Sequence, residues 1–244
     1  MKYGILGDIH ANLSALQVAL SRMDAEGVEQ LVSVGDVVGY GAAPSECIAL
    51  LRERHALVVL GNHDAAVAGL LDDLHFNPYA RTAVAWTRRA LNRGEQEWLS
   101  ELPLTETTDD CQVAHGTLYR PELFNYFLSQ TDADSSLDVM ERPVCFVGHS
   151  HIPITVMRLE DEPHRTAYTY DTEVDLSETT RALMNVGSVG QPRDDNPHTA
   201  FLLYDSVTRS ARLLREEYDV QRESRRILDA GLPSVLAERL HMGV

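Results

Sequence analysis

The chain has 244 residues, of which 44% are hydrophobic, and its formal net charge at pH 7 is −16. A chain of this length and apolar content can bury a substantial core, so we expect one globular domain over residues 1–244. The negative charge argues against broad binding to DNA or to anionic membranes, because both rely on a basic protein face. We therefore expect no membrane and no long nucleic acid as partner, whereas a small phosphorylated substrate is compatible with this charge.

The sequence carries no pattern for export or for membrane insertion. No early stretch combines a basic start with a long apolar core, and no apolar run approaches the roughly 20 residues that span a bilayer. The three cysteines, Cys47, Cys111 and Cys145, are odd in number and lack the paired spacing of a thiolate metal site. Such cysteines are typical of reduced core thiols, and we predict a soluble cytoplasmic protein.

The first half of the chain alternates short apolar runs with segments of helical spacing. We expect strands over residues 3–6, 31–34 and 56–60, and helices over 13–23, over 44–54 and in the alanine-rich stretch after Asp64. Residues 77–102 are predicted to be mostly helical, with a break at Asn92 and Gly94. Strands that alternate with helices favour a parallel sheet joined by helical crossovers.

The second half changes to short apolar runs separated by turn residues. These runs predict strands over residues 112–114, 144–147, 154–158, 167–170, 181–186, 200–204 and 211–215. Crossover units followed by hairpins predict an α/β fold in which two mixed sheets pack face to face with helices outside, a four-layer sandwich. Residues 118–142 are the least patterned and could form a lid. Residues 219–241 predict two C-terminal helices, which could mediate a homodimer.

Five short polar segments each follow an apolar run directly. They are Gly7-Asp8-Ile9-His10, Gly35-Asp36, Gly61-Asn62-His63-Asp64, His115-Gly116 and Gly148-His149-Ser150-His151. Between them they contribute three aspartates, one asparagine and five of the ten histidines. All five lie at the C-terminal ends of predicted strands, where open α/β sheets bind their ligands. We therefore expect these side chains to meet in one site.

The types of side chain in these segments indicate metal binding. Alternate residues of an extended backbone point the same way, so Asp8 with His10, and His149 with His151, could each face one ion. A Gly-Asp pair after a strand is as often a simple turn, which stays open for Gly35-Asp36 taken alone. Recurrence at five strand ends favours the metal site, because independent turns would not need histidine.

The donor set also limits the metal. Carboxylates, imidazoles and one amide, without thiolate, suit Mn²⁺, Fe or Zn²⁺ better than the all-oxygen shells usual for Mg²⁺ and Ca²⁺. The seven donors from these segments are too many for one tetrahedral zinc. We predict two divalent ions that share one carboxylate, with Mn²⁺ as the first expectation and Fe, Zn²⁺, Ni²⁺ or Mg²⁺ as alternatives.

Taken in order, the five segments resemble the signature of the calcineurin-like metallophosphoesterases, which reads D-x-H, G-D-x-x, G-N-H-[DE], H and G-H-x-H. The resemblance extends from residue 4 to about residue 205 and implies the family's β-sandwich flanked by helices. It implies that one metal binds Asp8, His10 and His151, that the second binds Asn62, His115 and His149, and that Asp36 bridges the two.

The resemblance also implies a mechanism, in which a hydroxide that bridges the two metals attacks phosphorus in line. His63 would stabilise or protonate the leaving oxygen, with Asp64 orienting it, although a more distant hydrogen-bonding role is an alternative for His63. Asn62 is a further candidate to bind substrate. Arg193, in a glycine-rich segment, could bind a phosphate oxygen, or the segment could be a tight turn between late strands.

The second segment bears on the substrate. In the serine/threonine phosphatases and diadenosine tetraphosphatases it continues as G-D-x-x-D-R-G, whereas here residues 35–41 read GDVVGYG, without the Asp-Arg pair. The chain is more similar to the small bacterial and archaeal phosphodiesterase-type members. We expect hydrolysis of phosphodiesters, with a cyclic or short nucleotide as one candidate substrate. The alternatives are a protein or nucleotide phosphatase that acts on monoesters, a nuclease, and a non-catalytic scaffold of the same fold.

Overall fold

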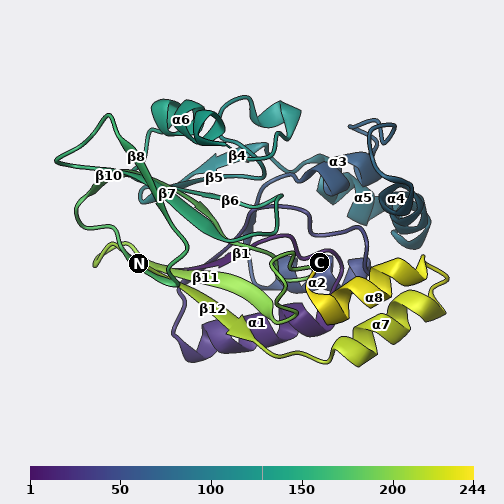
Figure 1. Cartoon of the computed structure of the whole chain (residues 1–244). Helices are drawn as coiled ribbons and strands as arrows, with labels where there is room; N and C mark the ends of the chain where they lie inside the picture. The colour runs from purple at the N-terminus through teal and green to yellow at the C-terminus, as the bar shows by residue number, and fades with distance from the viewer. Residues whose placement is uncertain (128) are drawn as a thin grey trace.

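The computed structural model of the chain describes residues 1–127 and 129–244 and contains two mixed six-stranded sheets (Figure 1). The first sheet has the order β3-β2-β1-β11-β12-β9 and the second has the order β4-β5-β6-β10-β7-β8. The strands of the first sheet are β1 (Lys2–Leu6), β2 (Gln30–Ser33), β3 (Leu57–Val58), β9 (Glu173–Asp175), β11 (Thr199–Asp205) and β12 (Ser210–Glu216). Those of the second are β4 (Thr105–Thr107), β5 (Cys111–Ala114), β6 (Val144–Val147), β7 (Ile154–Leu159), β8 (Thr166–Thr169) and β10 (Thr179–Asn185).

The two sheets follow the same plan of strand directions. In the first, β1 pairs in parallel with β2, and β2 with β3, while β11 continues the sheet antiparallel to β1. In the second, β6 lies parallel to both β5 and β10, and β7 pairs antiparallel with β10. The crossovers from β1 to β2 and from β2 to β3 contain α1 (Leu13–Ala25) and α2 (Pro44–Glu53), as the alternating pattern predicted.

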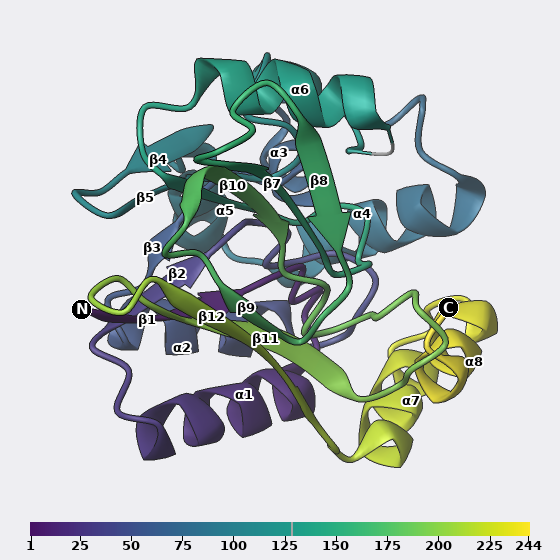
Figure 2. The same ribbon diagram turned by 60° about the vertical axis from the view of Figure 1, so that its left-hand side comes forward.

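The sheets pack face to face through an apolar layer. Ile5 and Val32 of the first sheet belong to one buried cluster with Val113 and Phe146 of the second. Helices α1 and α2 contribute to a separate buried cluster that includes Phe201 of the first sheet. Helix α6 (Gln130–Val139) packs in the same way on the second sheet. Figure 2 shows the resulting order of layers, which confirms the predicted four-layer α/β sandwich.

The remaining helices lie around the edge of the sandwich. They are α3 (Asn62–Ala68), α4 (Pro78–Ala90), α5 (Arg93–Ser100), α7 (Val220–Asp229), α8 (Ser234–Met242) and the 3₁₀ turn η1 (Pro121–Leu123). Side-chain oxygens of Asn77 and Asn92 accept hydrogen bonds from the first turns of α4 and α5, which confirms the break expected near Asn92. Residues 118–142 contain η1 and α6, with residue 128 outside the described part, and their closure as a lid stays a prediction.

The C-terminal helices pack against the body of the chain. Ile227, Leu236 and Leu240 are buried in one cluster with Tyr40 and with residues of α4. Their main apolar positions therefore contribute to packing within the chain, and a homodimer through these helices stays a prediction. Within the described residues, no helix combines the length and the apolar character needed to cross a bilayer.

A buried carboxylate fixes α7 to α1. Glu223 is only 1% exposed, and its Oε1 accepts hydrogen bonds from the backbone nitrogen of Ser14 at 3.1 Å and from the Ser14 hydroxyl at 2.5 Å. The Arg226 guanidinium donates to the same oxygen at 2.7 Å. Because a buried carboxylate is costly unless it is paired, this network holds the tail in one place.

We expect Glu223→Ala to lower the free energy of unfolding by about 1–3 kcal/mol, because it leaves buried donors of Ser14 unpaired. Urea denaturation followed by circular dichroism measures the change. Glu238→Ala, at an exposed position of α8, is the matched control and should change stability by less than about 0.5 kcal/mol. Equal stabilities of the two variants would show that the Glu223 network does not hold the tail.

Candidate metal centre

The ligand-bearing loops follow β1, β2, β5 and β6 and have an unusual backbone. Asp8, His10, Asp36, His149 and His151 all have positive φ angles, between 42° and 67°. This left-handed conformation costs of order 1–3 kcal/mol for a residue with a side chain and is found mainly at functional sites. Main-chain hydrogen bonds hold the loops together, among them one from His10 to the Asp36 carbonyl at 2.9 Å. The loops thereby direct five polar side chains to one place.

Asp8, His10 and His151 form the first group of side chains that could hold a metal. Their ligand atoms all lie within 4.8 Å of one another. Nε2 of His10 is 3.1 Å from Nε2 of His151, which in turn is 3.4 Å from Oδ1 of Asp8. Nδ1 of His10 donates to the Val38 carbonyl, and Nδ1 of His151 donates to the Gln191 carbonyl. With the proton on Nδ1, each Nε2 presents a lone pair to the centre of the group, as in metal-bound histidines.

Asp36, His115 and His149 form the second group, and their ligand atoms also lie within 4.8 Å of one another. Nε2 of His115 lies 3.0 Å from Nδ1 of His149 and 3.0 Å from Oδ1 of Asn62. Nδ1 of His115 donates to a main-chain carbonyl at 2.9 Å, so its Nε2 carries a lone pair rather than a proton. Oδ1 of Asn62 likewise has only lone pairs, and two lone pairs that face one another across 3.0 Å repel unless a cation lies between them. The donors present therefore fit a metal ion.

Asp36 lies between the two groups. Its Oδ2 is 3.6 Å from Nε2 of His10 in the first group and 3.5 Å from Nε2 of His115 in the second. Its other oxygen, Oδ1, accepts a hydrogen bond of 2.8 Å from the backbone nitrogen of His63. One carboxylate oxygen is thus anchored by the main chain while the other faces both groups. This position is compatible with a carboxylate shared by two ions, and that role of Asp36 stays a prediction.

Burial keeps the imidazoles of the two groups neutral and makes their carboxylates costly to ionise. It raises the pKa of Asp36 to about 7, and burial followed by repulsion from Asp36 raises the pKa of Asp8 well above its ordinary range. Burial lowers the pKa of His115 to about 4 and the pKa of His149 to about 2. The imidazoles are therefore neutral donors at pH 7, and two adjacent buried carboxylates carry a cost that a cation would offset.

Two glycines of the motifs are required by close approach to these carboxylates. A Cβ at Gly61 would lie 2.1 Å from Oδ1 of Asp36, and one at Gly148 would lie 2.3 Å from Oδ2 of Asp8. The main chain thereby approaches Asp8 closely, and the backbone nitrogen of His149, the residue after Gly148, donates to both oxygens of Asp8 at 3.0 Å. The glycines thus let the main chain bind the carboxylates directly.

His63 lies beside the two groups without belonging to either. Its ring is 4% exposed, and the ring centroid is 4.9 Å from that of His10 and 4.4 Å from that of Tyr40. Burial, with a further effect from the Arg193 guanidinium, lowers the pKa of His63 to about 3. Nδ1 of His63 is buried and has no hydrogen-bond partner among the described residues. Gly39 packs against this nitrogen, because a Cβ at Gly39 would lie 2.5 Å from it. His63 also lines a cleft beside the two groups, which makes it a candidate for contact with substrate.

The Asp64 carboxylate lies away from the His63 ring, which it was expected to orient. Instead of contacting the His63 ring, its carboxylate accepts main-chain hydrogen bonds from Val37 at 3.2 Å, Val38 at 3.0 Å and Gly61 at 3.2 Å. Consecutive residues of a helix point roughly 100° apart, so Asp64 faces away from the side that carries His63. The expectation that Asp64 orients His63 therefore finds no support. The carboxylate instead joins the loop after β2 to the start of α3.

Arg193 lies close to the predicted site. Its guanidinium carbon is 5.8 Å from the centroid of the Tyr40 ring, and its Nη2 donates to the Gln191 side chain at 3.1 Å. Nε of Arg193 is buried without a partner in the described part of the chain. Its positive charge counteracts the rise in the pKa of Asp8 and of Asp36. The cation is thus near enough to act on a ligand at the two groups.

Sequence reasoning missed several neighbours of the site. The Tyr126 ring stacks on His149 with centroids 3.9 Å apart, and the Phe76 ring lies 4.9 Å from that of His63. Arg239 of α8 is also near, since the Arg193 charge contributes to the lowered pKa of its guanidinium. These residues lie in loops or in a distant helix, and none follows a strand. No local pattern could have identified them.

Two adjacent buried groups of carboxylates and imidazoles, at one edge of a four-layer sandwich, define a candidate dinuclear metal site. Comparison with known proteins agrees. Residues 1–208 match the calcineurin-like phosphoesterase superfamily domain, and the chain belongs to this superfamily.

Individual relatives resemble almost the whole chain. An uncharacterized protein of Methanocaldococcus jannaschii is 33% identical, and the match covers 98% of this chain and 97% of that protein. The crystal structure of a metallophosphoesterase from Sphaerobacter thermophilus superimposes with a TM-score of 0.87 at 35% identity, covering 100% of this chain and 99% of the other. A hypothetical protein from Pyrococcus horikoshii has the same fold, with a TM-score of 0.81 at 20% identity and coverage of 100% and 98%.

Metal removal should destabilise the protein. Each group takes ligands from both sheets, and an ion present at about 100 times its Kd stabilises by about 2.7 kcal/mol, or roughly 5–10 °C for a chain of this size. We expect Tm, measured by differential scanning calorimetry, to fall by at least this amount after chelation and to recover with Mn²⁺.

In the variant Asp36→Asn, which alters a proposed ligand, Mn²⁺ should no longer raise Tm after chelation. In Asp109→Asn, at an exposed turn, Mn²⁺ should restore Tm as it does in the wild-type protein. Elemental analysis of wild-type protein should find about two ions per chain. A Tm that is insensitive to chelation in protein of proven metal content would contradict the assignment.

The role of Asp64 is tested separately. Asp64→Ala leaves three main-chain N–H groups without their acceptor, and we expect the metal-free protein to lose about 1–3 kcal/mol of stability. Chemical denaturation measures this change, with Asp109→Ala as the exposed control. Unchanged stability of Asp64→Ala would return Asp64 to the direct role beside His63 that the sequence suggested.

Proposed function

We propose that this protein is a metal-dependent phosphoesterase that hydrolyses phosphodiesters. The observation that carries the proposal is the position of Asp36, whose Oδ2 lies within 3.6 Å of a histidine nitrogen in each of the two groups. In this proposal the first ion binds Asp8, His10 and His151, the second binds Asn62, His115 and His149, and Asp36 contacts both. The mixed donors favour Mn²⁺, with Fe, Zn²⁺, Ni²⁺ or Mg²⁺ as alternatives.

Metal ions bound here would supply Lewis acidity toward the phosphoryl oxygens and toward water. The other roles fall to this chain's own residues. His63 lines the cleft beside the two groups, and we assign its ring to stabilising or protonating the leaving oxygen. Arg193 offers an unpartnered Nε and a full charge, which suit a phosphate oxygen. Asn62 lines the cleft beside His63, where its amide is suited to contact substrate.

Hydrolysis of a diester breaks the bond from phosphorus to the leaving oxygen. Water supplies the new oxygen on phosphorus, and a proton ends on the released alcohol. In this scheme Asp64 is a positioning residue, because its three main-chain hydrogen bonds hold Val37, Val38 and Gly61, which lie next to Asp36 and Asn62.

A preference for diesters is supported by two features. The loop at residues 35–41 lacks the Asp-Arg pair of the phosphatase branches. The cleft beside His63 is lined largely by apolar and aromatic side chains, which suit an organic substituent. A small phosphorylated molecule is the proposed substrate, and cyclic or short nucleotides are candidates. Three buried free cysteines support a cytoplasmic location, and a homodimer is compatible with the fold.

The test compares the hydrolysis of bis-p-nitrophenyl phosphate and p-nitrophenyl phosphate by the same preparation. The protein is first chelated and then supplied with Mn²⁺, Mg²⁺, Zn²⁺ or Ni²⁺. We expect faster cleavage of the diester, restored best by Mn²⁺. His63→Ala should lower kcat by about 10²–10⁴-fold, the usual contribution of a proton donor, without changing metal content.

His164→Ala, which replaces an exposed histidine, is the matched control and should leave kcat unchanged. Faster cleavage of the monoester would replace the diesterase by a phosphatase. A metal-loaded protein that cleaves neither ester faster than the His63→Ala, Asp36→Ala double variant would be a scaffold rather than an enzyme.

A further inference from the structure

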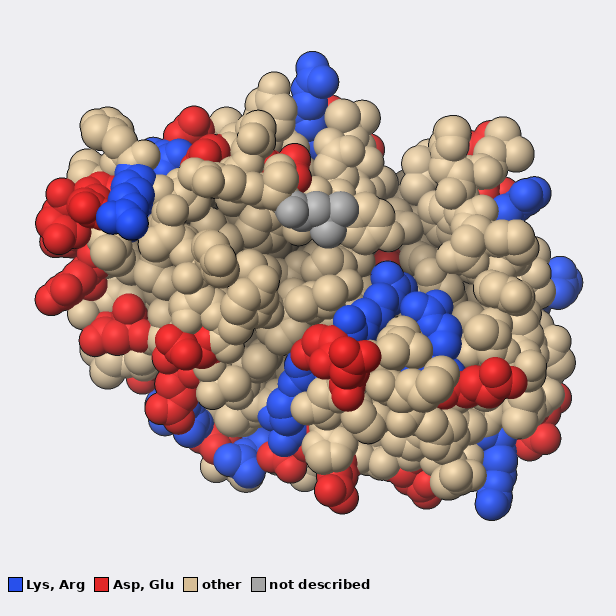
Figure 3. All heavy atoms as spheres, in the orientation of Figure 1, with Lys and Arg blue, Asp and Glu red and all other residues tan. Residues whose placement is uncertain are grey.

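A cleft of about 420 Å³ opens beside the two metal groups and lies within the size range of sites for small organic ligands. Asn62, His63 and His149 form its inner end. One wall comes from the connection between α3 and α4, and the other from η1 and the residues that follow it. Figure 3 shows a hollow between the surfaces over these two parts of the chain. Because His63 lines this cleft, a leaving group in contact with His63 would occupy it.

Both walls carry apolar side chains and rings. Leu71 and Phe76 lie on one side, and Leu123, Phe124 and Tyr126 lie on the other. The two innermost rings are fixed against the site, since Phe76 packs on His63 and Tyr126 stacks on His149. Flat apolar walls of this kind bind a planar ring by burial of apolar area and by stacking.

The cleft has an apolar rim that is open to solvent. Leu123 is 52% exposed and Tyr126 is 45% exposed, although both line the cleft. Exposed apolar side chains that border a concave site commonly mark a ligand-binding surface. A bound ring would cover both side chains.

The charges near the site are distributed unevenly. The described residues that line the cleft include Asp72 and His75 but no lysine or arginine. The cations are found on another side, where Arg193 lies over Tyr40 and where Arg239 of α8 is near. Figure 3 shows basic side chains over α8, at the border of the hollow. A phosphate therefore finds its positive partners at the Tyr40 end of the cleft, and an anionic group between the two walls would face Asp72 with no lysine or arginine among the lining residues.

We propose that this cleft binds the leaving group of the substrate and selects an uncharged alcohol that carries a ring, such as a nucleoside or an aryl alcohol. Leaving groups that bear a further phosphate or carboxylate are disfavoured, because no cation in the cleft offsets their desolvation. This inference rests on the proposed function. It narrows the substrate class to esters whose released alcohol is neutral and planar.

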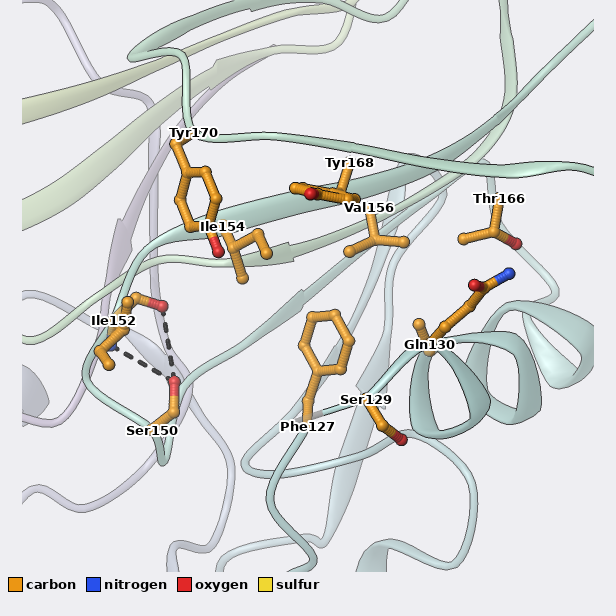
Figure 4. A pocket seen from close by; sticks show the side chains of 11 residues that line it. Phe127, Ser129, Gln130, Ser150, Ile152, Ile154, Val156, Thr166, Tyr168 and Tyr170 are labelled. Carbon is orange, nitrogen blue, oxygen red and sulfur yellow. Dashed lines mark hydrogen bonds between the residues drawn. The ribbon is translucent and has the colours of Figure 1, made fainter.

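A second pocket, of about 370 Å³, does not serve this role. It lies between α6 and the strands β7 and β8, where Phe127, Ile154 and Tyr168 point into it (Figure 4). It reaches the metal loops through Ser150 and Ile152, and the Ser150 hydroxyl contacts Ile152 and Asn185 rather than a proposed metal ligand. Since neither His63 nor any proposed metal ligand lines this pocket, a leaving group there could not reach His63.

The test uses two phosphodiesters that share a methyl group on the retained side. One releases p-nitrophenol, and the other releases a nitrophenol of matched acidity that carries a carboxylate. We expect the wild-type protein to favour the neutral leaving group by at least roughly tenfold in kcat/KM. Leu123→Lys places a cation at the rim and should reduce this ratio by at least roughly threefold. Val207→Lys adds the same charge at a position that is 81% exposed on a distant turn, and should leave the ratio unchanged.

Equal kcat/KM values for the two diesters, in protein that cleaves both and loses activity with His63→Ala, would overturn the cleft inference and leave the proposed function intact. The cleft inference would also be overturned if Leu123→Lys and Val207→Lys lowered the preference for the neutral leaving group, measured as the ratio of the two kcat/KM values, by the same factor. If neither diester is cleaved, the proposed function fails and the cleft is tested by calorimetry of the metal-loaded protein. Diphenyl phosphate should then bind at least roughly tenfold more tightly than its monocarboxylated analogue, and equal Kd values would overturn the inference.

Discussion

The apolar packing of one sheet on the other is the constraint on which the site depends. Residues such as Ile5 and Phe146 hold the sheets in a fixed relation, and the loops after β1 and β2 thereby meet those after β5 and β6. Each metal group takes ligands from both sheets. His151 of the second sheet's loops joins Asp8 and His10, and Asp36 of the first sheet's loops joins His115 and His149. The site is therefore a property of the whole sandwich rather than of any one motif.

The same loops explain why the centre is costly without a cation. Five of the candidate ligand residues adopt the left-handed backbone, two carboxylates are buried side by side, and the Nε2 lone pairs of His10 and His151 face one another. Main-chain donors offset part of this cost, as at Asp8 and Asp36, but they do not neutralise the charge. The glycines of the G-N-H and G-H-x-H motifs have a physical reason. A side chain at Gly61 would displace the Asp36 carboxylate, and a side chain at Gly148 would displace that of Asp8.

The two buried groups of carboxylates and imidazoles could be anticipated because their residues lie in the loops that follow strands, and strand ends are visible in the sequence. Clear hydrophobic periodicity also predicted the parallel units from β1 to β3 and the two C-terminal helices. Helix α6 was not, because its sequence is polar and buries only Ala133, Ser136 and Leu137. The contacts of Asp64, Phe76 and Tyr126 depend on where distant loops meet, which local patterns do not encode. The cleft and its missing cations could be recognised only in three dimensions.

The division of each ligand group between the two sheets has a consequence for assembly. Neither group is complete in the unfolded chain or in a single folded sheet. In the proposed dinuclear site, both ions would therefore bind after the two sheets have come together. Their identity would then depend on a finished cavity of mixed donors and on the cation that is plentiful at that moment. The metal content of the purified protein would thus record the ion supply where the chain folded.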